Sequence, residues 1–113
     1  MAGNAASSME LAEIRRLASN PSKVRVTRTA QYDLLGRGLN KTDICSEIVT
    51  WIDTGEPVKK VLLKQEDVGH PAFELKPRIN NSRFYVKVKL CELGEAGEFM
   101  LLISVHLDHG FGK

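Results

Sequence analysis

The chain lacks the features that define several large classes of protein. Its longest apolar runs, such as residues 99–105, are far shorter than the roughly 20 residues that a membrane-spanning helix needs. The N-terminal segment lacks the basic start and the apolar stretch of a secretory signal. Two cysteines, Cys45 and Cys91, are too few for a disulfide framework, and no closely spaced Cys or His residues offer a zinc site. These absences predict a cytoplasmic protein with free thiols, no membrane contact, no metal and no cofactor.

The length and composition fit one globular domain. With 113 residues, of which 42% are hydrophobic and 27% charged, the chain can bury one hydrophobic core. We expect a flexible leader at residues 1–8, a single domain over residues 9–108 and a tail at residues 109–113.

The first half of the sequence has the periodicity of helices. Ser7 and Glu10 have the spacing of a capping box, in which each side chain accepts the other's backbone N–H, so a helix is expected to begin there. Two more helices are expected, one ending at a Gly-Arg-Gly sequence and one starting at Asn40 or Thr42 and ending before Pro57.

After Pro57 the apolar period changes from about 3.6 residues to 2, which is typical of strands. Four strands are expected, at residues 58–64, 72–76, 83–92 and 98–108. Helices followed by strands indicate an α+β fold, with the N-terminal helices packed on one face of a three- to four-stranded antiparallel sheet.

Charge is distributed more unevenly than the net value of +2 suggests. Residues 59–89 carry eight lysines and arginines against three acidic residues. A one-sided basic surface is typical of proteins that bind polyanions such as RNA. The alternative is that these side chains only solvate the exposed faces of strands.

The alternation of the last two strands predicts their register. If Glu95 and Ala96 form a two-residue loop, opposed residue numbers sum to 191 and Tyr85 lies opposite His106. Every core residue then meets a core residue, in the pairs Phe84–Leu107, Val86–Val105, Val88–Ile103 and Leu90–Leu101.

For the pairing of the strand at residues 72–76 with the strand at residues 83–92, we expect opposed residue numbers to sum to 159. This register pairs Leu75 with Phe84 and Glu74 with Tyr85. One row of side chains would then hold Glu74, Tyr85 and His106 on the face away from the helices. Lys76, Arg83 and Lys87 would flank that row on the same face.

Such a row has the groups that cleave RNA at its 2′-hydroxyl. The reaction needs a base for that hydroxyl, an acid for the departing 5′-oxygen and cations for the charge on the phosphate. We interpret His106 as the acid, Tyr85 as a group that orients the phosphate or assists proton transfer, and Glu74 as the base. The alternative for His106 and Tyr85 is that each is an ordinary exposed strand residue.

The order of motifs along the chain resembles the MqsR-type toxins, the motility quorum-sensing regulator family within the RelE-like superfamily. The resemblance runs from about residue 11 to residue 108. It is carried by RVTRTA (25–30), LLGRGL (34–39), KKV (59–61), LKPR (75–78), FYVKV (84–88) and LISVH (102–106). It implies helices on one side of a small antiparallel sheet, metal-independent cleavage of mRNA, and a cognate antitoxin protein that neutralises the toxin.

The resemblance also implies roles for particular residues. It places an active-site lysine at Lys59 and an active-site tyrosine at Tyr85, and it puts His106 where the MqsR type carries lysine. The family has a catalytic glutamine on the strand at residues 72–76, where this sequence reads PAFELK, so Glu74 is the candidate replacement. The expected phosphate-binding residues are Lys60, Lys76, Arg78, Arg83 and Lys87.

Two other functions fit the same sequence. A non-catalytic module could bind RNA or a protein partner through the basic sheet face, and an interaction domain could work through the helices of residues 28–54. The row of Glu74, Tyr85 and His106 favours the endoribonuclease, because a mere binder does not need it.

Overall fold

The structure is a computed structural model of the chain, and it describes residues 5–61, 72–92 and 98–107. Three α-helices come first, α1 (Ser8–Ala18), α2 (Arg28–Gly36) and α3 (Lys41–Asp53). A 3₁₀ turn (Pro21–Lys23) and a three-residue strand, β1 (Val24–Val26), connect α1 to α2. The remaining strands are β2 (Lys59–Val61), β3 (Ala72–Leu75), β4 (Arg78–Ile79), β5 (Ser82–Glu92) and β6 (Glu98–Leu107).

The helices begin at side-chain caps, as the sequence predicts for α1 and α3. The Ser7 hydroxyl accepts the backbone N–H of Glu10, whose carboxylate accepts the N–H of Ser7. Asn40 and Asp43 form the same reciprocal pair at the start of α3. Each pair satisfies two donors that a helix N-terminus would otherwise leave unbonded.

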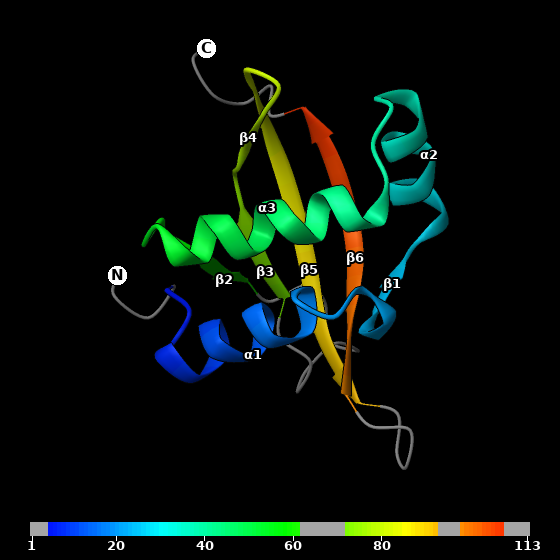
Figure 1. Cartoon of the computed structure of the whole chain (residues 1–113). Helices are drawn as coiled ribbons and strands as arrows, with labels where there is room; N and C mark the ends of the chain where they lie inside the picture. Colours follow the sequence, from blue (N-terminus) through cyan, green and yellow to red (C-terminus); the bar gives the residue numbers. More distant parts are fainter. Residues whose placement is uncertain (1–4, 62–71, 93–97, 108–113) are drawn as a thin grey trace.

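The strands form one six-stranded mixed sheet (Figure 1). Five of its strands lie in the order β1-β6-β5-β3-β2, and β4 pairs with β5 outside this order. All pairs are antiparallel except β1 with β6, which is parallel. The α+β class is therefore confirmed, but the expected number of strands, three or four, is wrong because β1 and β4 are too short to show a period of two.

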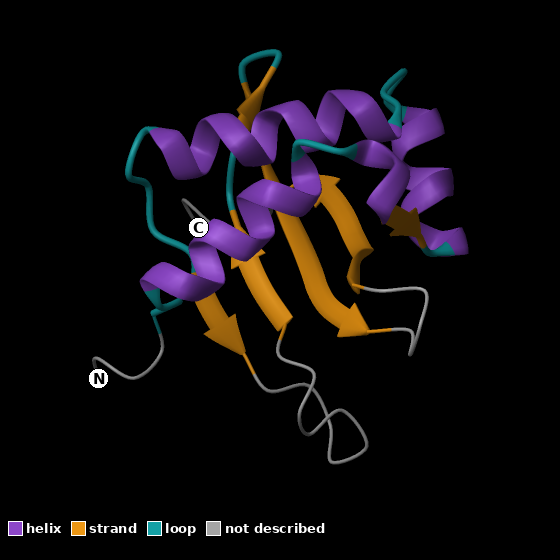
Figure 2. Ribbon diagram, turned by 60° about the horizontal axis from the view of Figure 1, so that its bottom comes forward, coloured by secondary structure: helices purple, strands orange, loops and turns teal. Residues whose placement is uncertain are grey.

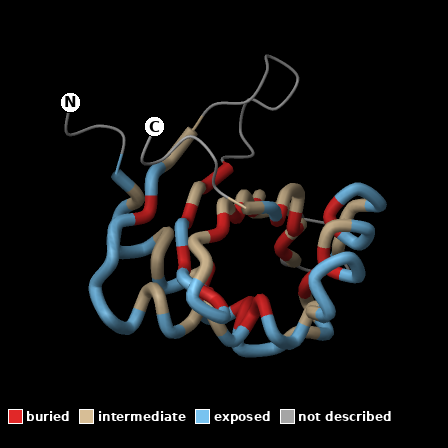
Figure 3. Tube along the Cα trace, turned by 90° about the horizontal axis from the view of Figure 1, so that it is seen from above, coloured by how far each residue is buried: buried red, intermediate tan, exposed pale blue. Residues whose placement is uncertain are grey.

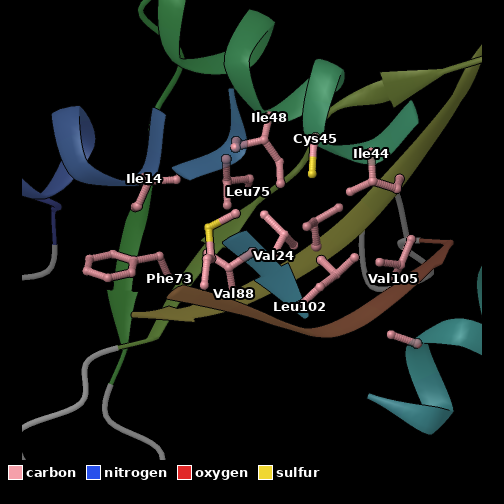
Figure 4. Close-up of a cluster of buried hydrophobic side chains, with 14 of the residues drawn as sticks. Ile14, Val24, Ile44, Cys45, Ile48, Phe73, Leu75, Val88, Leu102 and Val105 are labelled. Carbon is pink, nitrogen blue, oxygen red and sulfur yellow. The ribbon is translucent and has the colours of Figure 1, made fainter. Parts of the chain in front are cut away.

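The helices lie on one side of the sheet (Figure 2). Their apolar faces and the facing strand residues form one buried cluster, which includes Ile14 of α1, Ile48 of α3, Leu75 of β3 and Leu102 of β6 (Figure 4). Buried segments line the space between the helical layer and the sheet (Figure 3). We call this side of the sheet the inner face and the opposite side the outer face. Within the described residues, no helix is long and apolar enough to cross a membrane.

The register of the β5–β6 hairpin agrees with the sequence at one end only. Tyr85 pairs with His106, and Lys87 pairs with Ser104, so opposed numbers sum to 191 there. From Val88 onwards the partner changes to Leu102, which leaves Ile103 as one extra residue in β6. This is a β-bulge, in which two residues of one strand oppose one residue of the other.

The bulge corrects the expected inner face of β6. Beyond it the buried side chains are Leu102 and Met100, both with 0% exposure, instead of the expected Ile103 and Leu101. An extra residue reverses the side to which each later side chain points, because side chains alternate along a strand. The predicted pairs Val88–Ile103 and Leu90–Leu101 are therefore wrong, and the predicted loop at residues 95–96 lies outside the described residues.

The predicted register of β3 is wrong by two residues. Leu75 pairs with Val86, and Glu74 pairs with Lys87, so opposed numbers sum to 161 instead of 159. The cause is the tight turn at Asn80 and Asn81, which both have positive φ, at 52° and 68°. Asparagine tolerates this left-handed conformation, and two such residues form the preferred turn of a two-residue hairpin. Because β3 and β4 both precede this turn and both pair with β5 after it, opposed residue numbers have the same sum in the two pairs of strands.

Candidate functional site

The outer face brings the predicted proton-transfer residues together. The Tyr85 hydroxyl donates a hydrogen bond to Glu74 Oε2 over 2.6 Å, although the two residues are diagonal neighbours and not the directly opposed pair that we expected. The length lies in the usual range of an O–H···O hydrogen bond. The side chains of Glu74 and Tyr85 are both part-buried, so the bond holds the carboxylate in a fixed place.

His106 lies on the other side of Tyr85. The two rings are stacked, with centroids 5.0 Å apart and an interplanar angle of 25°. His106 Nδ1 is 3.0 Å from the backbone carbonyl oxygen of Leu107 and can donate to it when protonated. His106 is exposed, so Nε2 is left for a ligand. We call Glu74, Tyr85 and His106 the proton-transfer cluster.

Lysines stand beside the cluster in the next row of the sheet. Glu74 pairs with Lys59 of β2 on one side and with Lys87 of β5 on the other. Lys87 in turn pairs with Ser104 of β6. The Lys87 ammonium also lies 5.8 Å from the centroid of the Tyr85 ring. The Glu74 position therefore lies between two lysine positions, and one of these lysines also lies beside the Tyr85 ring.

Lys60 lies on the other side of the sheet from Lys59. Its backbone position pairs with Phe73, which is fully buried on the inner face, and its ammonium is 2.7 Å from Glu10 Oε2 of α1. Partial burial raises the pKa of Glu10, but the hydrogen bonds from Lys60 and Ser7 and the charge of Lys60 together outweigh it and lower that pKa. The structure thus separates Lys60 from the other predicted phosphate-binding residues.

Three other predicted phosphate-binding residues, Lys76, Arg78 and Arg83, lie near the end of β3, whereas Lys87 lies in the row of Glu74. Arg78 and Arg83 are paired in the β4–β5 hairpin, and one Arg83 guanidinium nitrogen donates to the backbone oxygen of Lys76 over 3.0 Å. Lys76 and Arg78 are exposed, and Arg83 is half-buried. The hydrogen bond to the backbone thus helps to fix the Arg83 side chain.

A cavity of about 540 Å³ opens next to the cluster. Glu74 belongs both to the cavity wall and to the proton-transfer cluster, so the cavity adjoins the site. Its polar and aromatic lining residues are Trp51, Glu56, Lys59, Glu74, Lys76 and Arg83. The indole N–H of Trp51 donates to the backbone oxygen of Pro57, which fixes the ring at this wall.

The two cysteines differ in setting. Cys45 is buried in the core with 1% exposure, and burial raises the pKa of its thiol to about 11, against a smaller opposing effect of the Lys41 charge. Cys91 is half-buried on the outer face, opposite Phe99 and at the far end of β5 from Tyr85. In the described part of the chain, no three His, Cys, Asp or Glu side chains are grouped as a metal site.

The register that sums to 191 also predicts Ser104 opposite Lys87, and the structure confirms this pair. Two residues of the outer face were not placed there from the sequence: Arg25 of β1 pairs with Leu101, and Phe99 pairs with Cys91. Phe99 was expected in the core, and the bulge explains its place outside. The isolated segment VRVT gave no indication that Arg25 would join the same sheet, because parallel pairing with a distant strand has no local sequence signal.

Comparison of the chain with protein-family models, with curated proteins and with solved structures found no match.

Proposed function

We propose that the protein is a cytoplasmic endoribonuclease that cleaves mRNA by attack of a 2′-hydroxyl on the adjacent phosphate. The observation that supports this most is the contact of a carboxylate, a phenol and an imidazole on the outer face. Glu74 accepts the Tyr85 hydroxyl over 2.6 Å, and His106 stacks on the Tyr85 ring. A surface that only binds RNA needs cations and aromatic rings but has no use for a fixed carboxylate beside them.

In the first half of the reaction, the 2′-oxygen forms a bond to phosphorus. Glu74 accepts the proton of the 2′-hydroxyl, and the Tyr85 hydrogen bond keeps the carboxylate in position. Tyr85 is then a positioning residue for the base. Lys59 and Lys87 hold the phosphate oxygens and offset the charge that develops on them, as preorganised cations do in phosphoryl chemistry.

In the second half, the bond from phosphorus to the 5′-oxygen breaks. His106 donates a proton to that oxygen, which leaves as a hydroxyl, and the other product ends in a 2′,3′-cyclic phosphate. One proton has left the 2′-hydroxyl and one has reached the 5′-oxygen, so the step balances without a metal or cofactor. The neighbouring cations Lys76, Arg78 and Arg83 bind flanking phosphates.

The cellular role that we propose is that of the toxin of a toxin–antitoxin pair, related to the MqsR-type toxins of the RelE-like superfamily. The support is the ordered set of motifs together with the proton-transfer cluster. The partner is an antitoxin protein that covers the basic outer face or blocks access to it. Neutralising Lys59, Lys76 and Arg78 together should then weaken the binding of both RNA and antitoxin, and both affinities should become less sensitive to salt.

Incubation of the purified protein with a defined oligoribonucleotide tests the reaction. We expect one product with a 5′-hydroxyl and one with a 2′,3′-cyclic phosphate or 3′-phosphate, also in the presence of a chelator. A substrate with a single 2′-deoxynucleotide before the cut should resist cleavage at that bond. Products with a 3′-hydroxyl end would refute the reaction.

The second candidate is a non-catalytic module that binds RNA or protein through the same face. It is favoured by the basic residues around the cluster, which would serve either function. A measurement of RNA cleavage distinguishes the two candidate functions, because a binding module binds RNA without cutting it. Binding of intact RNA with no detectable products would decide for the module.

A further inference from the structure

The bulge in β6 gives the outer face an apolar end. Lys89 pairs with Leu101, and Cys91 pairs with Phe99, on the same side as Tyr85 and Lys87. Leu101 and Phe99 are half-buried, whereas their neighbours Met100 and Leu102 are fully buried on the inner face. Without the extra residue, Phe99 and Leu101 would join the core instead.

Thr27, which follows β1 and caps α2, is hydrogen-bonded to the bulge. Its backbone N–H donates to the Leu102 oxygen over 3.1 Å, and its hydroxyl donates to the Ile103 oxygen over 3.0 Å. The same hydroxyl accepts the backbone N–H of Ala30 at the start of α2. The irregular part of β6 is therefore hydrogen-bonded to Thr27 on the side away from β5, so the position of Phe99 on the outer face is set by the fold.

A cation accompanies the Phe99 ring on the outer face. Arg25 of β1 pairs with Leu101, and its guanidinium carbon lies 4.8 Å from the centroid of the Phe99 ring. Lys89 stands in the same row as Leu101, one strand further on. We call Arg25, Lys89, Phe99 and Leu101 the Phe99 strip.

We propose that the Phe99 strip binds single-stranded RNA that extends from the proton-transfer cluster, an inference that rests on the proposed function. Bases stack on aromatic rings and on arginine guanidinium planes, and cations between them neutralise the phosphates. The strip has both kinds of group. On β5, Lys87 lies between Lys89 of the strip and Tyr85 of the proton-transfer cluster. Its cations are complementary to a polyanion.

The spacing suits an extended strand. Cys91, which pairs with Phe99, is six residues from Tyr85 along β5, a distance of about 20 Å at the usual rise of a strand. A single nucleotide at the cluster cannot reach the strip, whereas an oligonucleotide of several residues can contact both. The strip should therefore contribute to the affinity of long RNA and contribute nothing to that of a trinucleotide.

Equilibrium binding of labelled RNA to full-length protein carrying His106→Ala tests this, because the variant is expected to leave the RNA intact. Phe99→Leu keeps the apolar volume but removes the ring. It should weaken the binding of an RNA of about 12 nucleotides by roughly 5- to 100-fold and leave the binding of a trinucleotide unchanged. Arg25→Gln should weaken the binding of the long RNA. It should also reduce the magnitude of the slope of log K against log salt concentration by about 0.7.

Matched controls come from α2 and its C-cap residue, away from the outer face. Tyr32→Leu removes an aromatic ring with 68% exposure, and Arg37→Gln removes an exposed arginine, so both should bind long RNA like the parent. The proposal is overturned if Phe99→Leu and Arg25→Gln also bind long RNA like the parent, which is the result expected of a strip that docks a protein. Failure of the proposed reaction has a different signature, since wild-type protein would then bind long RNA but not cut it.

Discussion

The two faces of the sheet use alternate residues of the same strands for different purposes. On β3, Phe73 and Leu75 have 0% exposure and belong to the core under the helices. Glu74 lies between them, points the other way and accepts the Tyr85 hydroxyl. Because side chains alternate along a strand, one strand of four residues contributes both to the stability of the fold and to the candidate site. Substitutions at adjacent positions should therefore affect different properties.

The largest expected contrast is in the reactivity of the two thiols. Cys45 is buried and its raised pKa keeps it protonated at pH 8, whereas Cys91 is half-buried on the outer face. A thiol reagent should modify Cys91 in the folded protein and Cys45 only when the protein unfolds, with rates that differ by about 10³-fold or more, since the unfolded fraction is that small. Stopped-flow or colorimetric labelling measures this. The Cys91→Ser variant should lose the fast phase, and persistence of that phase would show that the core is open.

Adjacent residues of β3 provide the next contrast. Leu75→Ala should lower the free energy of unfolding by about 2–5 kcal/mol, because it leaves a cavity in the core. Glu74→Gln should change it by less than about 1 kcal/mol, because its side chain is only part-buried and the amide can still accept the Tyr85 hydroxyl. Urea unfolding of the two variants compares them. Equal losses would mean that the outer face also stabilises the fold.

Lys59 and Lys60 are neighbours on β2 that point to opposite faces. Lys59→Ala should weaken RNA binding by several-fold and lower its salt slope by about 0.7, the effect of one lost phosphate contact. Lys60→Ala removes the same charge from the inner side, where it pairs with Glu10, and should leave RNA affinity nearly unchanged. Fluorescence titrations at several salt concentrations measure both. A similar loss in the two variants would indicate long-range attraction by net charge.

The smallest expected effect concerns stability in acid. The pKa of Glu10 is lowered in the folded protein, so its ion pair with Lys60 stabilises the fold above the ordinary glutamate pKa and loses that contribution as the pH falls through the folded value. Glu10→Gln should therefore reduce stability at pH 7 by at most about 1 kcal/mol, the usual limit for a partly exposed pair. The difference from wild type should shrink as the pH falls below about 4. Thermal unfolding at a series of pH values measures it, and a difference that persists in acid would contradict the assignment.

Much of the local structure could be predicted from the sequence. The capping box of α1, a start of α3 at Asn40 and the pairing of Tyr85 with His106 follow from residue spacing and alternation, and the structure confirms each of them. The predicted register of β3 is wrong because residue spacing alone does not show where the connecting turn at Asn80 and Asn81 is placed. Their positive φ values show that they form a two-residue turn, which moves every pair by two positions.

The long-range features of the site could not be predicted from the sequence. The bulge at Ile103 depends on hydrogen bonds from Thr27, which lies 76 residues earlier in the chain. Residues 99–103 are all apolar, so alternation does not indicate which of them face the core, and nothing local shows that Phe99 turns to the outer face. The contact of Glu74 with Tyr85 was predicted from the wrong register and is formed because a tyrosine is long enough to reach a diagonal neighbour.

The central claim is that the outer face carries the reaction and contributes little to the fold. It is tested most directly by measuring the cleavage rate of a defined RNA and the melting temperature together, for wild type and for His106→Ala. Loss of a general acid should lower the rate by about 10²–10⁴-fold. The melting temperature should remain within a few degrees of wild type, because the His106 side chain is exposed. Cleavage by His106→Ala at the wild-type rate would contradict the account.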